Sequence, residues 1–131
     1  MSKKLRLMIF LISISLLEGC SMINTTSPVK TRIIDKKSPM QAEFNFDLGK
    51  ACYNQGHFAK SISYLFKSIK NFTSSKRIAD AYMLIGANYF YLDEVDYAKK
   101  YFKKSKRSYS KCYPNKKDFP NEIRKLFYSV K

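Results

Sequence analysis

The sequence has no tryptophan, one histidine, three cysteines and only four glycines and four prolines among 131 residues. So little glycine and proline excludes a collagen-like chain and argues against a disordered one. It contains no pair of histidines, no CxxC motif and no glycine-rich phosphate loop, so the usual signals of a metal, redox or nucleotide site are missing. Acidic residues are also scarce, 10 against 25 Lys and Arg, and the formal charge of +15 favours an anionic partner over a cationic one.

The overall amino-acid composition is typical of a folded chain. Apolar residues make up 45% and charged residues 27% of the sequence, which is typical of globular proteins. The length suffices for one small domain and excludes two separately cored enzyme domains.

The N-terminal residues have the layout of an export signal. Lys3, Lys4 and Arg6 precede an apolar run from Leu7 to Leu17 that is broken only by two serines. As a helix this run would be about 16 Å long, well short of the roughly 30 Å hydrocarbon core of a bilayer. The pattern therefore predicts a secretory signal that is cleaved, in preference to a membrane-spanning helix.

The end of that run resembles the lipobox of bacterial lipoproteins, with Leu17, Gly19 and Cys20 at the matching positions. The resemblance implies that residues 1–19 are a lipoprotein signal peptide and that Cys20 becomes the lipidated N-terminus, anchored firmly by its acyl chains. It also implies, from Ser21, a place on the periplasmic side of the outer membrane. The alternative is an ordinary secretory signal, with Cys20 an incidental thiol.

Residues 20–38 are predicted to be a flexible tether, because polar residues there surround isolated apolar ones without sustained periodicity. A helical domain is expected over residues 39–131. Its start is marked by Ser38 as an N-cap, Pro39 in the first helical position and Gln41 three residues after the cap.

Apolar residues recur every three or four positions in four segments, which predicts helices over residues 39–54, 58–71, 78–91 and 95–111. Phe44, Leu48 and Cys52 define the expected packing face of the first helix. Asp93 is expected to cap the fourth. A tight turn at Gly56 joins the first two helices as an antiparallel hairpin.

The hairpin pattern repeats after 37 residues, which brings Leu48 and Gly49 into register with Ile85 and Gly86. Small residues in both units leave room for close helix packing. Residues 42–75 and 79–112 resemble tetratricopeptide (TPR) repeats at these positions: Leu48, Gly49, Cys52, Gly56, Phe58, Ser61, Leu65 and Ser68, then Tyr82, Ile85, Gly86, Tyr89, Ala98, Phe102 and Ser105.

The expected fold is therefore all-α, with two helical hairpins stacked as a short right-handed solenoid. Repeat domains need a terminal cap, and residues 120–131 are predicted to supply one as a helix with Ile123, Phe127 and Val130 on its packing face.

The TPR resemblance implies that a peptide binds in the concave groove lined by the first helix of each unit. Aromatic and Met side chains there are typical of a binding surface. We expect them to be exposed, unless the tether or the capping helix covers them, and to contribute little to stability. The predicted partner-binding residues are Phe46, Lys50, Tyr53, Asn54, Asp80, Met83, Phe90 and Tyr91.

A second candidate surface is basic. It lies on the predicted helix within residues 94–111 and consists of Lys99, Lys100, Lys103, Lys104, Lys106, Arg107 and Lys111. These residues either contact lipid phosphates, lipopolysaccharide or an acidic protein, or form a solvated outer face. The export signal argues against nucleic acid as the partner.

No group of residues suggests catalysis. His57 is interpreted as a solvated turn residue, and Asp93, Glu94 and Asp96 as charges that complement a helix N-terminus. Cys52 is expected to be a buried small apolar residue. We expect no enzyme activity, cofactor, metal or small-molecule substrate. The leading hypothesis is an envelope adaptor that binds another envelope protein, similar to the TPR lipoproteins of outer-membrane protein assembly and type IV pilus assembly.

Overall fold

The computed structural model describes residues 38–131, so the predicted signal peptide, the lipidation of Cys20 and nearly all of the tether lie outside the described residues. The described part of the chain is all-α and contains no strand, as predicted. Its helices are α2 (Pro39–Asn54), α3 (Phe58–Asn71), α4 (Ser75–Tyr91), α5 (Val95–Ser108) and α6 (Asn121–Ser129).

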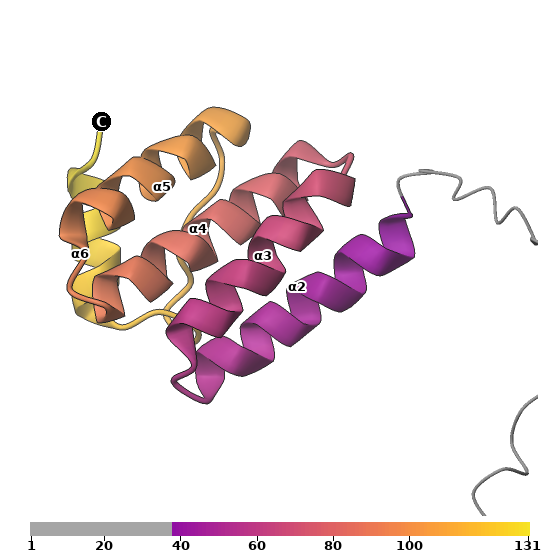
Figure 1. Ribbon diagram of the computed structural model, residues 1–131. Coiled ribbons are helices and arrows are strands. Elements are labelled where there is room, and N and C mark those ends of the chain that lie inside the picture. The colour runs from indigo at the N-terminus through magenta and orange to yellow at the C-terminus, as the bar shows by residue number, and fades with distance from the viewer. Residues whose placement is uncertain (1–37) are drawn as a thin grey trace, which may run out of the picture. The chain divides into compact units, whose positions relative to one another are not determined.

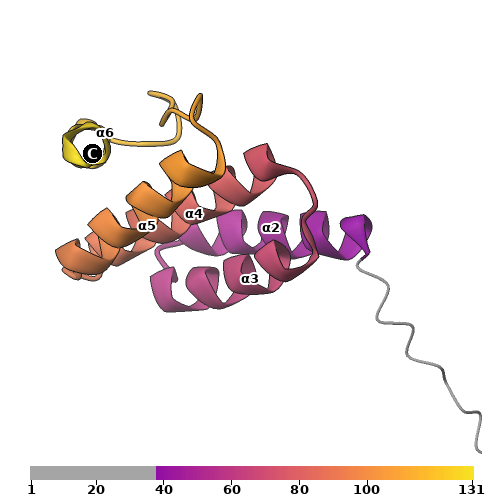
Figure 2. The same ribbon diagram turned by 90° about the horizontal axis from the view of Figure 1, so that it is seen from above.

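The first four helices form two hairpins, α2–α3 and α4–α5, and the hairpins contact each other chiefly through α3 and α4 (Figure 1). Seen from above, α2 and α4 run along one side of the stack, whereas α3 and α5 run along the other (Figure 2). The short helix α6 crosses the end of the stack beside α5 (Figure 2). The two hairpins therefore present the same kind of face, built from their first helices, on one side of the protein.

Close helix packing in each hairpin depends on a glycine. A Cβ atom added to Gly49 would lie 2.7 Å from Cγ of Leu65, and one added to Gly86 would lie 2.6 Å from Cδ1 of Phe102. Gly49 and Gly86 are 37 residues apart, and so are Leu65 and Phe102. The sequence repeat is therefore also a repeat of helix–helix contacts. The prediction that these glycines permit close approach is confirmed.

The turns inside the two hairpins also correspond. The amide of Gly56 donates to the carbonyl of Tyr53 at 3.0 Å, and that of Asp93, 37 residues later, donates to the carbonyl of Phe90 at 3.2 Å. Both turn residues are left-handed, with φ of 78° and 60°. The prediction that Asp93 caps α5 is wrong, because this residue shapes the turn and Glu94 occupies the N-cap position without a side-chain cap bond.

The sequence pattern misassigned the packing face of α2. Phe44 is 57% exposed, and the buried stripe consists of Ala42, Asn45, Phe46, Gly49, Cys52 and Tyr53. The reason is that Gly49 must face α3 to admit Leu65, and a residue five positions earlier lies about 140° around the helix. Cys52 is buried, as predicted.

Two helices have the predicted bounds and two differ. Residues 39–54 and 58–71 are helical as expected, and the Ser38 hydroxyl accepts a hydrogen bond from the Gln41 amide at 3.4 Å. The third helix begins three residues early, because Ser74 acts as its N-cap and accepts from the Arg77 amide. The fourth ends at Ser108, which leaves Lys111 outside the helix.

A buried polar cluster joins the two hairpins. The hydroxyl of Ser61 on α3 donates to the carbonyl of Gly49 at 2.7 Å. The side-chain amide of Asn88 on α4 donates to that hydroxyl at 2.9 Å and to the carbonyl of Leu84 at 2.8 Å. Both side chains are fully buried, so each bond replaces contact with water that folding removed.

The C-terminal helix α6 covers the end of the second hairpin. Ile123 and Phe127 are buried, as predicted, and the ring of Phe127 meets that of Phe102 edge to face at 5.4 Å. The predicted bounds of 120–131 were slightly too wide, since Pro120 serves as the N-cap of α6.

Candidate functional site

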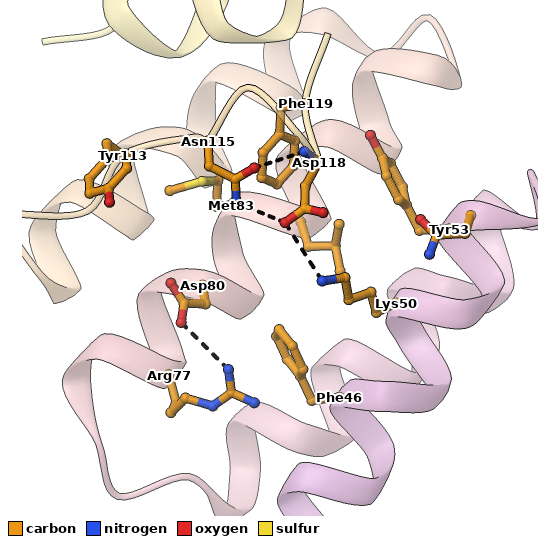
Figure 3. A pocket seen from close by; sticks show the side chains of 12 residues that line it. Phe46, Lys50, Tyr53, Arg77, Asp80, Met83, Tyr113, Asn115, Asp118 and Phe119 are labelled. Atoms are coloured by element: carbon orange, nitrogen blue, oxygen red, sulfur yellow. Dashed lines mark hydrogen bonds and ion pairs between the residues drawn. The ribbon is translucent and has the colours of Figure 1, made fainter.

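The candidate site is a cavity of about 190 Å³ between α2, α4 and residues 109–120, which we call the strap (Figure 3). The strap is the connection from α5 to α6 and crosses the face built from α2 and α4. Six predicted partner-binding residues line the cavity together: Phe46, Lys50, Tyr53, Asn54, Asp80 and Met83.

The other two predicted residues lie outside this cavity. Tyr91 is 41% exposed and stacks on Phe58 with ring centroids 4.7 Å apart, while its ring also lies 5.9 Å from that of Tyr53. Phe90 is half-buried against Tyr91. These rings form an aromatic cluster beside the end of the cavity.

The expectation that the groove side chains are exposed is wrong for its three central members. Phe46, Tyr53 and Met83 are 8%, 9% and 3% exposed. Arg77 lies over the Phe46 ring at 4.2 Å, and Phe119 of the strap lies 6.3 Å from Tyr53. These contacts come from α4 and from the strap rather than from the capping helix, and the tether lies outside the described residues.

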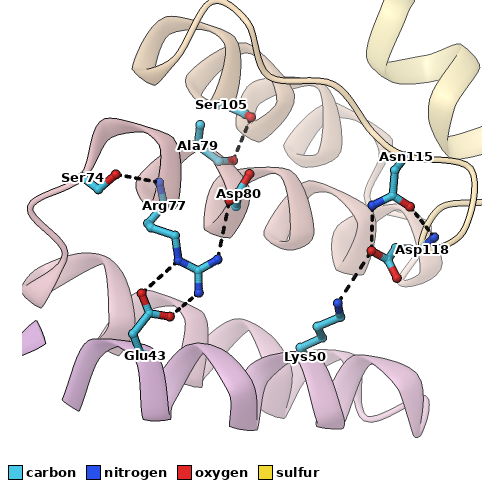
Figure 4. Close-up of polar contacts among 9 residues, drawn as sticks. All are labelled: Glu43, Lys50, Ser74, Arg77, Ala79, Asp80, Ser105, Asn115 and Asp118. Atoms are coloured by element: carbon cyan, nitrogen blue, oxygen red, sulfur yellow. Dashed lines mark hydrogen bonds and ion pairs between the residues drawn. The ribbon is translucent and has the colours of Figure 1, made fainter. Parts of the chain in front are cut away.

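An ion-pair network crosses one end of the site (Figure 4). Arg77 donates through Nε to Oε1 of Glu43 at 3.0 Å and through Nη2 to Oε2, which makes a two-bond contact between α4 and α2. Its Nη1 atom lies 3.6 Å from Oδ2 of Asp80. The hydrogen bonds to Glu43 raise the pKa of Arg77 further, so the guanidinium stays charged.

Asp80 is less well compensated than Glu43. It is half-buried and faces the cavity, and burial raises its pKa although the positive charge of Arg77 opposes the change (Figure 3). This wall of the cavity therefore carries the Asp80 carboxylate, which shares its ion-pair partner Arg77 with Glu43.

The strap is fastened at the other end of the site (Figure 4). Oδ2 of Asp118 lies 3.6 Å from Nζ of Lys50 on α2. Asn115 donates to that carboxylate at 2.7 Å and accepts from the Asp118 amide at 2.8 Å. The Asn115 hydrogen bond and then Lys50 lower the pKa of Asp118, so its carboxylate is ionised at neutral pH.

The phenol of Tyr53 is the most perturbed titratable group at the site. Burial raises its pKa above the ordinary range, and the neighbouring Tyr91 and Asp118 raise it further. The group is therefore neutral and serves as an apolar wall with a polar tip.

Sequence reasoning did not identify six residues at the site: Arg77, Leu84, Tyr113, Asn115, Asp118 and Phe119. Four of them belong to the strap, where no periodic pattern exists to indicate which way a side chain points. The one usable signal is the Asn115 to Asp118 spacing, since Asn commonly closes local turns.

The predicted basic surface is only partly exposed. Lys99, Lys100 and Lys103 are exposed and surround a surface hollow together with Lys131. Lys100 also lies over the Tyr97 ring at 5.6 Å, and the less exposed Lys104 lies over the rings of Tyr82 and Tyr101. Lys106 is similarly engaged, since it donates to the Val130 carbonyl and lies 4.7 Å from the Phe127 ring centre. Arg107 and Lys111 are exposed.

The remaining candidate side chains are one histidine and two cysteines. His57 is exposed in the turn before α3, as predicted. Cys52 and Cys112 are free thiols. Within residues 38–131, no three His, Cys, Asp or Glu side chains are grouped as metal ligands would be.

None of the helices in this range has the length and hydropathy that a membrane crossing requires. No protein-family model, curated protein or solved structure matches the chain.

Proposed function

We propose that this protein is a non-enzymatic adaptor of the bacterial envelope, anchored by lipid at Cys20, whose TPR-like hairpins dock a peptide segment of another protein between α2 and α4. The observation that carries the proposal is the convergence of six predicted partner-binding residues on one cavity. Binding surfaces concentrate aromatic and Met side chains with a few polar groups, and this cavity combines Phe46, Tyr53 and Met83 with Lys50 and Asp80.

Two features support the TPR likeness and the right-handed solenoid that it implies. The glycine contacts recur at the 37-residue offset, and so do the turn hydrogen bonds. Stacked units of this kind bury a continuous core and leave one face for ligands.

Site-specific photo-crosslinking in cells tests the docking site. A photoreactive amino acid at Tyr113, which is 69% exposed at the cavity, should give a defined adduct with one envelope protein. The same amino acid at Phe44, which is exposed on the other side of α2, is the matched control. Adducts of equal yield at both positions, or none at Tyr113, contradict the proposal.

The lipid anchor has its own test. Cys20→Ala should abolish labelling by radioactive palmitate and release the protein from the membrane fraction. A fully processed, membrane-bound Cys20→Ala protein contradicts anchoring at Cys20.

A second candidate function is binding to anionic lipid or lipopolysaccharide through the basic surface of α5. The specific observation is that Lys99, Lys100 and Lys103 surround a hollow with Lys131 and form no ion pair within the described residues. Replacing Lys99, Lys100 and Lys103 by Gln should abolish binding to anionic vesicles and its dependence on salt. Retained vesicle binding contradicts this function, and adaptor crosslinking should be unaffected.

A further inference from the structure

The strap lies on the proposed docking groove in the manner of a bound peptide. Its twelve residues between α5 and α6 contain no helix, which is long for a connection in a small helical domain. Pro114 and Phe119 are nevertheless buried, and Phe119 is 8% exposed. The strap is thus a non-helical segment with a turn over residues 116–118, and its Asp118 and Phe119 contact α2.

Two adjacent strap residues make the contacts that hold it. Asp118 pairs with Lys50 at 3.6 Å, and Phe119 places its ring 6.3 Å from that of Tyr53. The Phe119 amide donates to the carbonyl of Asn115 at 3.2 Å, so a local turn presents the carboxylate and the ring side by side.

The charges of the groove select what can replace the strap. Arg77 already pairs with Glu43 and Asp80, whereas Lys50 has Asp118 as its sole ion-pair partner among residues 38–131. If the strap leaves, Lys50 loses its ion pair with Asp118 and Tyr53 loses its contact with the Phe119 ring, while the contacts of Tyr53 with Phe58 and Tyr91 remain. A replacement must bring a carboxylate and an aromatic ring in the same arrangement.

The strap is held by a weak ion pair and does not fill the groove. The Lys50 and Asp118 side chains are 45% and 32% exposed, and ion pairs so exposed stabilise a structure only slightly. A cavity of about 190 Å³ remains beside the strap, with Phe46, Met83 and Asp80 on its walls. A ligand that reproduces both contacts and also fills this cavity can bind in preference to the strap.

We propose that the groove recognises peptide segments in which an acidic residue directly precedes an aromatic one, and that the strap is an internal ligand which such a segment displaces. The proposal rests on the proposed function, because it names the chemistry of the peptide that docks between α2 and α4. The strap then keeps the groove covered until a competing segment arrives.

The test uses the full-length chain in detergent and a fluorescent peptide with the sequence of residues 113–121. Fluorescence anisotropy measures its affinity for the natural chain and for the double variant Asp118→Ala with Phe119→Ala. The variant should bind at least about tenfold more tightly, because its own strap no longer competes. Adding Lys50→Glu to this variant should remove most of the gain, and a peptide with Lys in place of the acidic residue should not bind.

A second measurement covers the case in which the double variant fails to fold. Hydrogen exchange of the natural chain, with and without excess peptide, should then show faster exchange of strap amides and slower exchange in α2 when peptide is present. The conservative variant Asp118→Asn should show a smaller gain in affinity of the same sign.

Equal affinity of natural chain and double variant, or binding that is indifferent to Lys50→Glu, overturns the proposal. So does a concentration-dependent dimer that disappears in the double variant, since it would assign the groove to a second copy of the chain. A specific crosslink at Tyr113 without any binding of the peptide refutes this inference alone. If neither the Tyr113 crosslink nor peptide binding is observed, the docking function is refuted as well.

Discussion

A Cβ atom at Gly86 would lie 2.6 Å from two atoms of the Phe102 ring and 3.1 Å from the carbonyl oxygen of Ala98. Phe102 is fully buried and meets Phe127 on another side, so its ring has no free space to move into. The position is therefore closed to every residue larger than glycine.

Gly86→Ala should destabilise the protein although alanine is the better helix former. The propensity gain is about 1 kcal/mol, whereas overpacking a closed core costs about 1 to 3 kcal/mol, and contact with both ring and backbone falls in the upper part of that range. We expect a net loss of about 1 to 2 kcal/mol in urea denaturation. Ser63→Ala on the exposed face of α3 is the control, and an unchanged Gly86→Ala midpoint would contradict the packing shown here.

Tyr53 should make the protein less stable as pH rises into the alkaline range. Its folded-state pKa is raised, so above the ordinary tyrosine value near pH 10 the folded chain holds a proton that the unfolded chain has lost, and stability falls as pH rises. Tyr53→Phe should make this alkaline loss of stability shallower in thermal melts. Tyr113→Phe, at an exposed tyrosine, is the matched control. Identical slopes for natural chain and Tyr53→Phe would refute the assignment.

Arg77 should not be replaceable by lysine. It holds Glu43 through two hydrogen bonds and lies over the rings of Phe46 and Phe72 at 4.2 and 5.3 Å. A lysine keeps the charge and loses the planar fork, so Arg77→Lys should cost about 1 kcal/mol, measured by chemical denaturation at low salt. Lys76→Arg, one residue earlier and exposed, is the matched control. If Arg77→Lys left the stability unchanged, the contact with Glu43 would depend on charge alone and not on the planar guanidinium.

The Ser61 to Asn88 hydrogen bond should couple the two hairpins energetically. Ser61→Ala removes the partner of a buried amide and should cost about 1 to 2 kcal/mol. In a double-mutant cycle with Asn88→Ala, the coupling energy should be about 1 kcal/mol. Additive effects within error would mean that the hydroxyl and the amide act independently.

The helices could be predicted because their signals are local. Ser38 and Pro39 mark a helix start, and the repeated glycines mark where two helices approach each other. The rotation of α2 could not be predicted, because periodicity alone does not distinguish the stripe through Phe44 from the stripe through Phe46. Only the facing Leu65, distant in sequence, decides between them.

Six helical residues of the candidate site were predictable, whereas Arg77 and Leu84 of α4 and the strap residues were not. Residues of α2 and α4 could be assigned to one face by the 37-residue offset. Asp118 and Phe119 belong to an aperiodic segment, and their position depends on the Asn115 turn and on the path between α5 and α6. The same segment helps to bury Tyr53, so Tyr53→Ala would remove part of the core as well as part of the groove, contrary to the expectation that the groove side chains contribute little to stability.

The two corresponding turns differ in the strain that they store. Gly56 adopts its left-handed conformation freely, whereas Asp93 does so at a cost of about 1 kcal/mol. The turn of the second hairpin is therefore the one that opens more often, and its amides should exchange faster with solvent than those around Gly56. We therefore expect a single side chain, present in one turn and absent from the other, to make the two turns unequal in mobility.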